Sequence, residues 1–175
     1  MDERKLWEEC IAFHGHECGG LMIGFKASLY AMELLNADFS DDEEIVCVAE
    51  NDACGIDAIQ YVLGCSVGKG NLLFRLRGKQ AFSFMNRKTG QSVRIVLREK
   101  PPMAKEDSLA WYQSHKPCEL FEIKECTIEL PERARIFQSV KCENCGEMTA
   151  ENMIRLQNGK KLCLDCYTEY CRFDV

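Results

Sequence analysis

Four cysteines near the C-terminal end of the chain form two CxxC pairs, Cys142/Cys145 and Cys163/Cys166, with seventeen residues between them. Two pairs at this separation can bring four thiolates to one tetrahedral centre. Structural zinc sites are closed in this way, with four protein ligands and no open position. The spacing therefore predicts a small zinc module, and it constrains the fold more strongly than any other feature of the sequence.

The residues around these pairs indicate how the module folds. Asn158-Gly159 marks a hairpin turn between the two pairs. The stretch LCLDCYTEYC, residues 162–171, predicts a helix that starts at the second pair. A pair, a hairpin, a second pair and a helix, in this order, are typical of a treble-clef-like zinc module. We expect this module to span residues 138–175 and a larger domain to span residues 1–137.

A second group of possible metal ligands lies near the N-terminus. His14, His16 and Cys18 occupy alternate positions, which project to the same side of an extended backbone. Cys18 and Cys54 each precede a predicted helix, and the positive partial charge of a helix N-terminus lowers the pKa of a thiol. Two thiolates with imidazoles suit a second divalent metal, with zinc favoured. Three protein ligands and an open position would permit Lewis-acid chemistry.

Other interpretations of these residues stay open at the level of sequence. The two histidines could cap local backbone, and Cys54 could be a core residue. Cys65, in the glycine-rich loop 64–70, could be a fourth ligand, a redox partner or a small buried residue. The same loop superficially resembles a phosphate loop. It is one residue too short between its glycines, however, and has Gly70 where a Ser or Thr would bind magnesium.

The first domain has the pattern of an α+β fold, in which an antiparallel sheet meander packs on helices. The helix predicted over residues 20–35 is apolar almost all round and should therefore be buried on most sides. Pro101-Pro102 ends the predicted meander. Periodicity and turn residues predict further helices over residues 3–13, 55–63 and 104–115, and strands over 45–49, 71–77, 80–86, 91–98 and within 119–130.

Charge is unevenly distributed along the chain. The net charge is −6, but residues 1–60 hold 14 acidic and 3 basic side chains, and residues 69–100 hold 9 basic and 1 acidic. The two regions could neutralise each other, within one copy of the chain or across a dimer. Alternatively, a basic face could bind an anionic ligand or an acidic partner. The arginines of that face would be Arg75, Arg77, Arg94 and Arg98.

The composition also bears on the compartment. The N-terminus is charged and lacks the apolar segment of a signal peptide, and no apolar run approaches the ~18 residues that a membrane span needs. We therefore expect a cytoplasmic protein with no membrane contact. Cysteines are mostly reduced in that compartment, which favours metal ligation over disulfides for the twelve cysteines of this chain.

Two segments followed by the predicted strands resemble the FmdE-like family: FHGHECGGLMIG and ENDACGIDAIQYVLGCSVGKGNL. This family is named after a component of molybdenum or tungsten formylmethanofuran dehydrogenases. The resemblance covers residues 8–100, and this chain has Cys18-Gly19-Gly20 where the family often has CPG. It implies an α+β core, dimerisation and, in some members, an appended zinc module. It also implies a metal-binding cavity lined by His14, His16, Cys18, Cys54 and Cys65.

Three classes of function are compatible with these patterns. The leading hypothesis is a homodimeric, non-catalytic accessory protein whose partner is a molybdenum or tungsten enzyme or its cofactor. The second is a metal-dependent enzyme with Asp52 or Glu50 as a base, although no general base, and hence no catalytic residue, can be assigned. The third is a nucleic-acid-binding regulator. It is disfavoured because residues 139–175 hold 5 basic and 6 acidic side chains, whereas phosphate binding needs a basic surface.

Overall fold

A computed structural model describes residues 2–173. The chain forms two compact units, of which the first ends at Ala134 and the second begins at Arg135. The division lies three residues before the predicted domain boundary at residue 137, and the assignment of residues 1–137 and 138–175 to two domains stays a prediction. Among residues 2–173, no helix is long and apolar enough to cross a bilayer.

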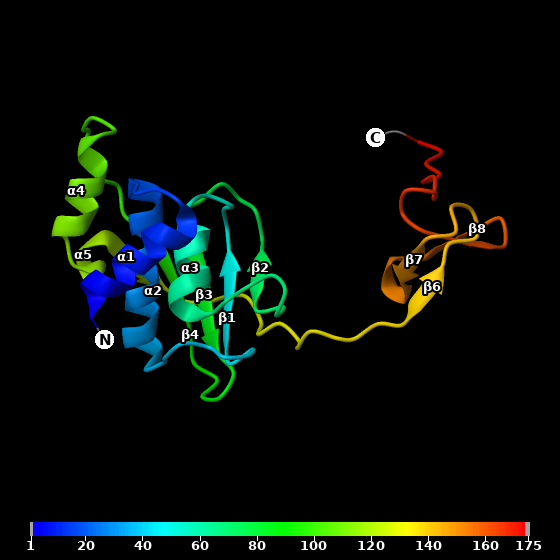
Figure 1. Ribbon diagram of the computed structural model, residues 1–175, viewed down its shortest axis with the longest axis horizontal. Coiled ribbons are helices and arrows are strands. Elements are labelled where there is room, and N and C mark those ends of the chain that lie inside the picture. The colour runs from blue at the N-terminus through cyan, green and yellow to red at the C-terminus, as the bar shows by residue number, and fades with distance from the viewer. Residues whose placement is uncertain (1, 174–175) are drawn as a thin grey trace. The chain divides into compact units, whose positions relative to one another are not determined.

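The first unit is an α+β structure, as predicted, and it is built on one five-stranded sheet (Figure 1). The strand order is β2-β1-β3-β4-β5. Strand β1 runs parallel to β2, and the other neighbouring pairs are antiparallel. The strands are β1 (Ile45–Ala49), β2 (Leu72–Phe74), β3 (Ala81–Asn86), β4 (Ser92–Leu97) and β5 (Phe121–Lys124).

The position of β1 corrects the predicted meander. The strand predicted over residues 71–77 was expected to pair with that over 80–86, but β1 lies between the two. All five residues of β1 are buried, and a central position buries both faces of such a strand. The chain at 75–79 is therefore not a hairpin. It crosses the end of β1, where the Arg77 amide donates to the Glu50 carbonyl at 2.9 Å.

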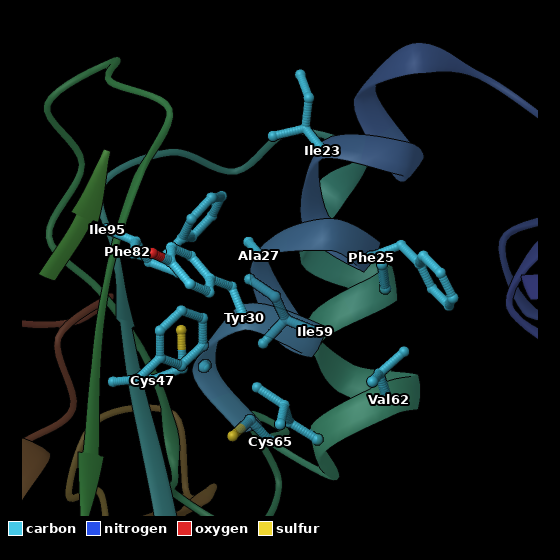
Figure 2. Packing of buried hydrophobic residues seen from close by; sticks show 14 of the residues in the cluster. Ile23, Phe25, Ala27, Tyr30, Cys47, Ile59, Val62, Cys65, Phe82 and Ile95 are labelled. Carbon is cyan, nitrogen blue, oxygen red and sulfur yellow. The ribbon is translucent and has the colours of Figure 1, made fainter. Parts of the chain in front are cut away.

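The helices cover one face of this sheet (Figure 1). Helix α2 is central, and ten of its 17 residues are buried, in agreement with the burial on most sides that its apolar sequence predicts. In Figure 2, Ala27 and Tyr30 of α2 and Ile59 of α3 lie in the core that Phe82 and Ile95 of the sheet also line. The helices are α1 (Glu3–His14), α2 (Gly19–Leu35), α3 (Gly55–Leu63), α4 (Asp107–Ser114) and α5 (Pro117–Leu120), and the first four lie close to their predicted ranges.

The other face of the sheet is covered by the chain that follows β5. Val46, Val48 and Met85 form a second apolar cluster, against which Cys126 and Ile128 pack. Further along the segment, a buried ion pair between Arg87 and Glu43, 3.4 Å apart, fixes the chain on the sheet. Arg87 also donates to the carbonyls of Pro131 and Glu132. Glu43 accepts a hydrogen bond from the Ala134 amide. These contacts explain why the first unit extends to Ala134.

The second unit consists of two small hairpins and the cysteine pairs. Its elements are β6 (Ser139–Lys141), β7 (Met148–Ala150), the 3-10 turn η1 (Glu151–Met153), β8 (Arg155–Gln157) and β9 (Lys160–Leu162). The turn between β8 and β9 is formed by Asn158 and Gly159, with φ angles of 52° and 77°, as predicted.

The prediction of a helix that starts at the second cysteine pair is wrong. The described chain after Leu162 makes one turn, in which the amides of Cys166 and Tyr167 donate to the Cys163 carbonyl, and then continues without regular structure to residue 173. Tyr170 and Phe173 are 81% and 70% exposed, so no apolar face supports a helix there. A helix this short is unstable without such packing.

Candidate metal centres

The first candidate centre lies where helices α2 and α3 begin. A Cβ atom on Gly24 of α2 would collide with the carbonyl oxygen of Gly55 in α3, so the two helices pack backbone against backbone at this point. Cys18 is the N-cap of α2 and Cys54 is the N-cap of α3. The close approach of the helices therefore places two cysteines, 36 positions apart in the sequence, beside each other.

Two histidines complete this group. His14 is the last residue of α1, and Gly15 turns the chain with a φ of 93°, which favours glycine. The ring centres of His14 and His16 lie 4.4 Å apart. The histidines thus converge through a helix end and a left-handed turn, whereas the sequence suggested an extended strand.

The four side chains offer one ligand atom each, and these atoms all lie within 4.8 Å of one another. Tetrahedral zinc with bonds of about 2.0–2.3 Å separates its ligand atoms by about 3.3–3.8 Å. Small side-chain adjustments would close the difference. The donor set of two imidazoles and two thiols also suits zinc, so the residues present fit such an ion. We name His14, His16, Cys18 and Cys54 the N-terminal cluster.

Asp57 orients one member of this cluster, His14, through a hydrogen bond. Its Oδ2 atom lies 2.7 Å from Nδ1 of His14, and because an ionised carboxylate can only accept, the ring nitrogen donates. This leaves Nε2 of His14 free as a ligand atom, 4.0 Å from Sγ of Cys18. Carboxylates commonly orient metal-binding histidines in this way. Asp57 was not assigned from the sequence, although its place one turn after Cys54 was a usable signal.

The protonation of Cys54 differs from the expectation for a helix N-terminus. Burial raises the pKa of Cys54, and the hydrogen bond and charge of neighbouring Cys18 raise it further. Cys54 makes no side-chain capping bond, whereas Sγ of Cys18 accepts from the Leu21 amide at 3.3 Å. In the metal-free protein, burial and the neighbouring Cys18 thus outweigh the backbone hydrogen bond that lowers the pKa of Cys54. A bound divalent ion would favour the thiolate, since metal coordination deprotonates thiols.

A cavity of about 680 Å³ opens beside the N-terminal cluster. Its lining includes His16, Cys18 and Cys54, together with Tyr112 of α4. His16 is exposed, whereas the other three members are partly buried. The cluster is therefore accessible to a small molecule, and His16 is the ligand that can exchange most easily.

Cys65 is not brought to this cluster. Cys54 and Cys65 lie at opposite ends of the nine-residue helix α3, which separates them by about 13 Å. Cys65 is fully buried in the core (Figure 2), its thiol lies 3.5 Å from the Ile45 carbonyl, and burial raises its pKa to about 12. It has the properties of a core residue and not of a ligand in this centre.

The loop 64–70 likewise gives no support to phosphate binding. The ammonium group of Lys69 donates to the carbonyls of Ser40 at 2.7 Å and Asp41 at 3.4 Å. A lysine that holds neighbouring backbone in this way is not directed at a ligand. The loop is a tight connection, which its glycine spacing had already favoured.

The second candidate centre is formed by Cys142, Cys145, Cys163 and Cys166, whose sulfur atoms lie within 4.8 Å of one another. The backbone amide of Cys163 donates to Sγ of Cys142 at 3.3 Å, and the Asn144 amide group donates to Sγ of Cys166 at 3.3 Å. Amide hydrogen bonds, first of all that from Cys163, lower the pKa of Cys142 to about 6. This sulfur is therefore ready to bind a cation at neutral pH.

The apolar core of the second unit is very small. Its buried residues are Cys142, Leu162 and Cys163, against which Cys166 and Tyr167 pack. Most of this core thus consists of the candidate ligands themselves. We therefore expect a unit of this kind to need a bound metal for stability, because little other buried surface holds it together.

Two family models match the chain. The first, described as "FmdE, Molybdenum formylmethanofuran dehydrogenase operon", matches residues 13–147. The second, described as "Prokaryotic dksA/traR C4-type zinc finger", matches residues 135–171. The second match includes all four cysteines of the C-terminal centre and shows that this unit is a zinc-finger module.

Individual proteins are also similar to the chain, and two of them are informative. A "Probable S-adenosyl-L-methionine-binding protein" of Archaeoglobus fulgidus is 28% identical over an alignment that covers 90% of this chain and 51% of the relative. The chain thus spans about half the length of that curated relative. The crystal structure of a tungsten formylmethanofuran dehydrogenase FmdE-like protein from Syntrophus aciditrophicus matches with a TM-score of 0.71 and 24% identity, over 94% of this chain and 91% of the other. This likeness shows a shared fold.

Proposed function

The chain belongs to the FmdE family, and from that premise we propose that it is a metal-binding accessory protein, with no catalytic activity of its own. The N-terminal cluster binds one divalent ion, with zinc favoured, and the C-terminal module binds a structural zinc. The observation that carries this proposal is the convergence of four ligand atoms within 4.8 Å, one of them oriented by Asp57.

The number of ligands favours a binding role over catalysis. Catalytic zinc sites keep three protein ligands and an open position, whereas four protein ligands close the coordination shell. Two imidazoles and two thiolates would also neutralise the charge of the ion. Catalysis would require the exposed His16 to leave, and the enzyme hypothesis therefore stays the weaker alternative.

The C-terminal module is suited to contact with a protein. Residues 139–175 are nearly neutral in charge, which does not favour binding to nucleic acid. The module nevertheless exposes large apolar side chains, which on a small surface mark interaction sites. They are Met148, Met153, Leu156, Leu164, Tyr170 and Phe173.

The description of the family suggests the partner. It refers to the operon of a molybdenum formylmethanofuran dehydrogenase, so we propose a molybdenum or tungsten enzyme, or its cofactor, as the partner of this chain. We also propose a homodimer and a cytoplasmic location. The twelve cysteines are all free, which suits a reducing compartment.

A second candidate function is the binding of a small molecule beside the metal. The cavity of about 680 Å³ lies within the size range of ligand sites, and the relative from Archaeoglobus fulgidus is named as a probable S-adenosyl-L-methionine-binding protein. Calorimetric titration of the metal-loaded chain with S-adenosylmethionine tests this candidate directly. Binding that is lost in Tyr112→Ala would support it, and the absence of heat would exclude it.

Metal analysis of the full-length chain tests the leading proposal. We expect two equivalents of metal in the wild type and one in each of Cys18→Ala and Cys142→Ala. Cys171→Ala is the matched control, because Cys171 is exposed and belongs to neither centre. A wild type with one equivalent, lost in Cys142→Ala and kept in Cys18→Ala, would contradict a metal role for the N-terminal cluster.

A further inference from the structure

A third polar site lies on the opposite face of the sheet from the helices, at the end of β1. Glu50 follows β1, and the chain at 75–79 is fixed across it by backbone hydrogen bonds. The amides of Arg77 and Lys79 both donate to the Glu50 carbonyl, at 2.9 and 3.4 Å. The Asn51 side chain donates to the Lys79 carbonyl at 2.8 Å. The backbone that presents these basic residues is therefore held in place.

Four cations and one carboxylate line a cavity of about 300 Å³ at this point. The lining residues are Glu50, Arg75, Arg77, Lys79, Arg94 and Thr127. We name this site the basic pocket. With every ionisable group in its usual charge state, the pocket has a net charge of +3. The acidic region at residues 1–60 contributes only Glu50 to it, so it leaves most of this basic charge unneutralised.

Glu50 and Arg94 form the inner part of the pocket. The Nε atom of Arg94 donates to the Glu50 carboxylate at 2.6 Å, and the two side chains, Arg94 and Glu50, are 17% and 8% exposed. This hydrogen bond holds the pKa of Glu50 below its usual value, so the carboxylate stays ionised and bonded. The pair fixes the direction of the Arg94 guanidinium, whose other N–H groups remain available as donors.

The outer cations of the pocket differ from Arg94 in their surroundings. Among residues 2–173, no carboxylate lies within 4.0 Å of the charged nitrogen atoms of Arg75, Arg77 or Lys79. Arg77 uses one N–H group on the carbonyl of Leu76. Exposed cations elsewhere, such as Arg4 and Lys5, do pair with glutamates. Four cations around one small cavity repel each other, and an anion between them would relieve this repulsion.

We propose that the basic pocket binds the phosphate or diphosphate group of a small phosphorylated ligand. Arginine presents planar N–H forks that match phosphate oxygens, and lysine adds a point charge. A terminal phosphate group carries up to about two negative charges and a terminal diphosphate group up to about three, which the excess of three positive charges can accommodate. The cavity volume is at the lower limit for ligand sites, so the pocket takes a phosphate group with little else attached.

The basic pocket is distinct from the N-terminal cluster, so its test is separate from that of the proposed function. Metal-loaded, full-length chain is titrated at low ionic strength with inorganic phosphate, pyrophosphate and citrate in a calorimeter. We expect one site that prefers pyrophosphate to citrate. The affinity should be unchanged when the N-terminal cluster is disabled by Cys18→Ala.

Paired variants locate the site. The double variant Arg75→Ala/Arg77→Ala removes two exposed side chains and should lower the affinity for pyrophosphate by about tenfold or more. The matched control Arg4→Ala/Lys5→Ala removes the same total charge from α1 and should leave the affinity unchanged. An equal loss in both double variants, or no binding at about 10 mM pyrophosphate, would overturn the proposal.

A third variant tests the electrostatic argument from the opposite direction. Glu50→Gln keeps the size of the side chain and raises the net charge of the pocket by one. We expect pyrophosphate to bind several-fold more tightly to this variant. An affinity no higher than that of the wild type would contradict the proposal, and a preference for citrate would overturn the assignment to phosphate.

Discussion

The Nδ1 atom of His14 lies 2.7 Å from the Oδ2 atom of Asp57, which joins the last residue of α1 to the first turn of α3. Asp57→Asn keeps the size of this side chain but removes its charge and its fixed role as an acceptor. We expect the affinity of the N-terminal cluster for zinc to fall about 10–100-fold, because a carboxylate that orients a histidine ligand contributes that much. Competition with a chromogenic chelator measures this affinity.

The control for this prediction is Asp52→Asn. Asp52 is exposed and lies close to Cys54 in the sequence, so it tests the general effect of removing a negative charge nearby. Zinc affinity should be nearly unchanged in this variant. If both variants weakened zinc binding equally, long-range charge and not the contact with His14 would be responsible.

A second prediction concerns the contact between α2 and α3. A methyl group on Gly24 would meet the carbonyl of Gly55, so Gly24→Ala forces the helices apart. Overpacking of this kind costs about 1–3 kcal/mol of the free energy of unfolding. It should also separate Cys18 from Cys54 and weaken zinc binding. Urea unfolding and metal analysis measure the two effects.

Gly68→Ala is the matched control, because a Cβ atom there meets nothing within 4 Å. It should change neither stability nor metal content. Gly24→Ala with wild-type stability would mean that the two helices can move apart without cost, and that the approach of their backbones does not hold the cluster together.

A third prediction concerns metal removal. The second unit has almost no core besides its cysteines, so a chelator should unfold it while the sheet and helices of the first unit persist. Limited trypsin digestion should then cleave after Lys141, Lys160 and Lys161. Both tryptophans, Trp7 and Trp111, belong to the first unit, so their fluorescence reports on that unit alone.

In the presence of excess zinc, the same cleavages should be slow. Cys142→Ala should show the rapid pattern even with zinc present, and Cys171→Ala should behave like the wild type. Rapid cleavage of the zinc-loaded wild type at these three lysines would show that the metal does not stabilise the module.

Local sequence patterns predicted several elements of the first unit well. The bounds of β1 and α3 agree with their predicted ranges, because a short apolar run and a terminal glycine are strong local signals. Gly64 indeed ends α3 with a φ of 68°. The alternate spacing of His14, His16 and Cys18 also identified a group that the structure brings together.

Features that depend on distant contacts could not be predicted in this way. Nothing in the periodicity of β1 shows that it lies between β2 and β3, since strand order is set by packing across the whole sheet. The bond between His14 and Asp57 joins residues 43 positions apart. Cys65 and Cys54 are both next to a glycine in the sequence. Their positions at opposite ends of α3 place Cys54 in the N-terminal cluster and Cys65 in the core.

A fourth prediction concerns pH. Hydrogen bonds from the amides of Asp42 and Glu44 and from the Ser40 hydroxyl lower the pKa of Glu44 to about 2, from an ordinary value of 4.5. A group with a depressed pKa contributes stability that is fully present above its unfolded value and is lost as the pH falls through its folded value. Glu44→Gln keeps an acceptor oxygen but removes the charge. The stability difference between wild type and Glu44→Gln should therefore be constant from pH 7 to about 5 and should shrink progressively from pH 4.5 towards about 2.

Urea unfolding of both proteins across this pH range measures the difference, and effects common to the two proteins cancel. Glu99→Gln, at an exposed position, is the control and should show no such profile. Because the hydrogen bonds to Glu44 come from the chain just before β1, loss of its charge should loosen that loop first. A difference that stayed constant down to the lowest pH would mean that the charge of Glu44 does not stabilise the loop.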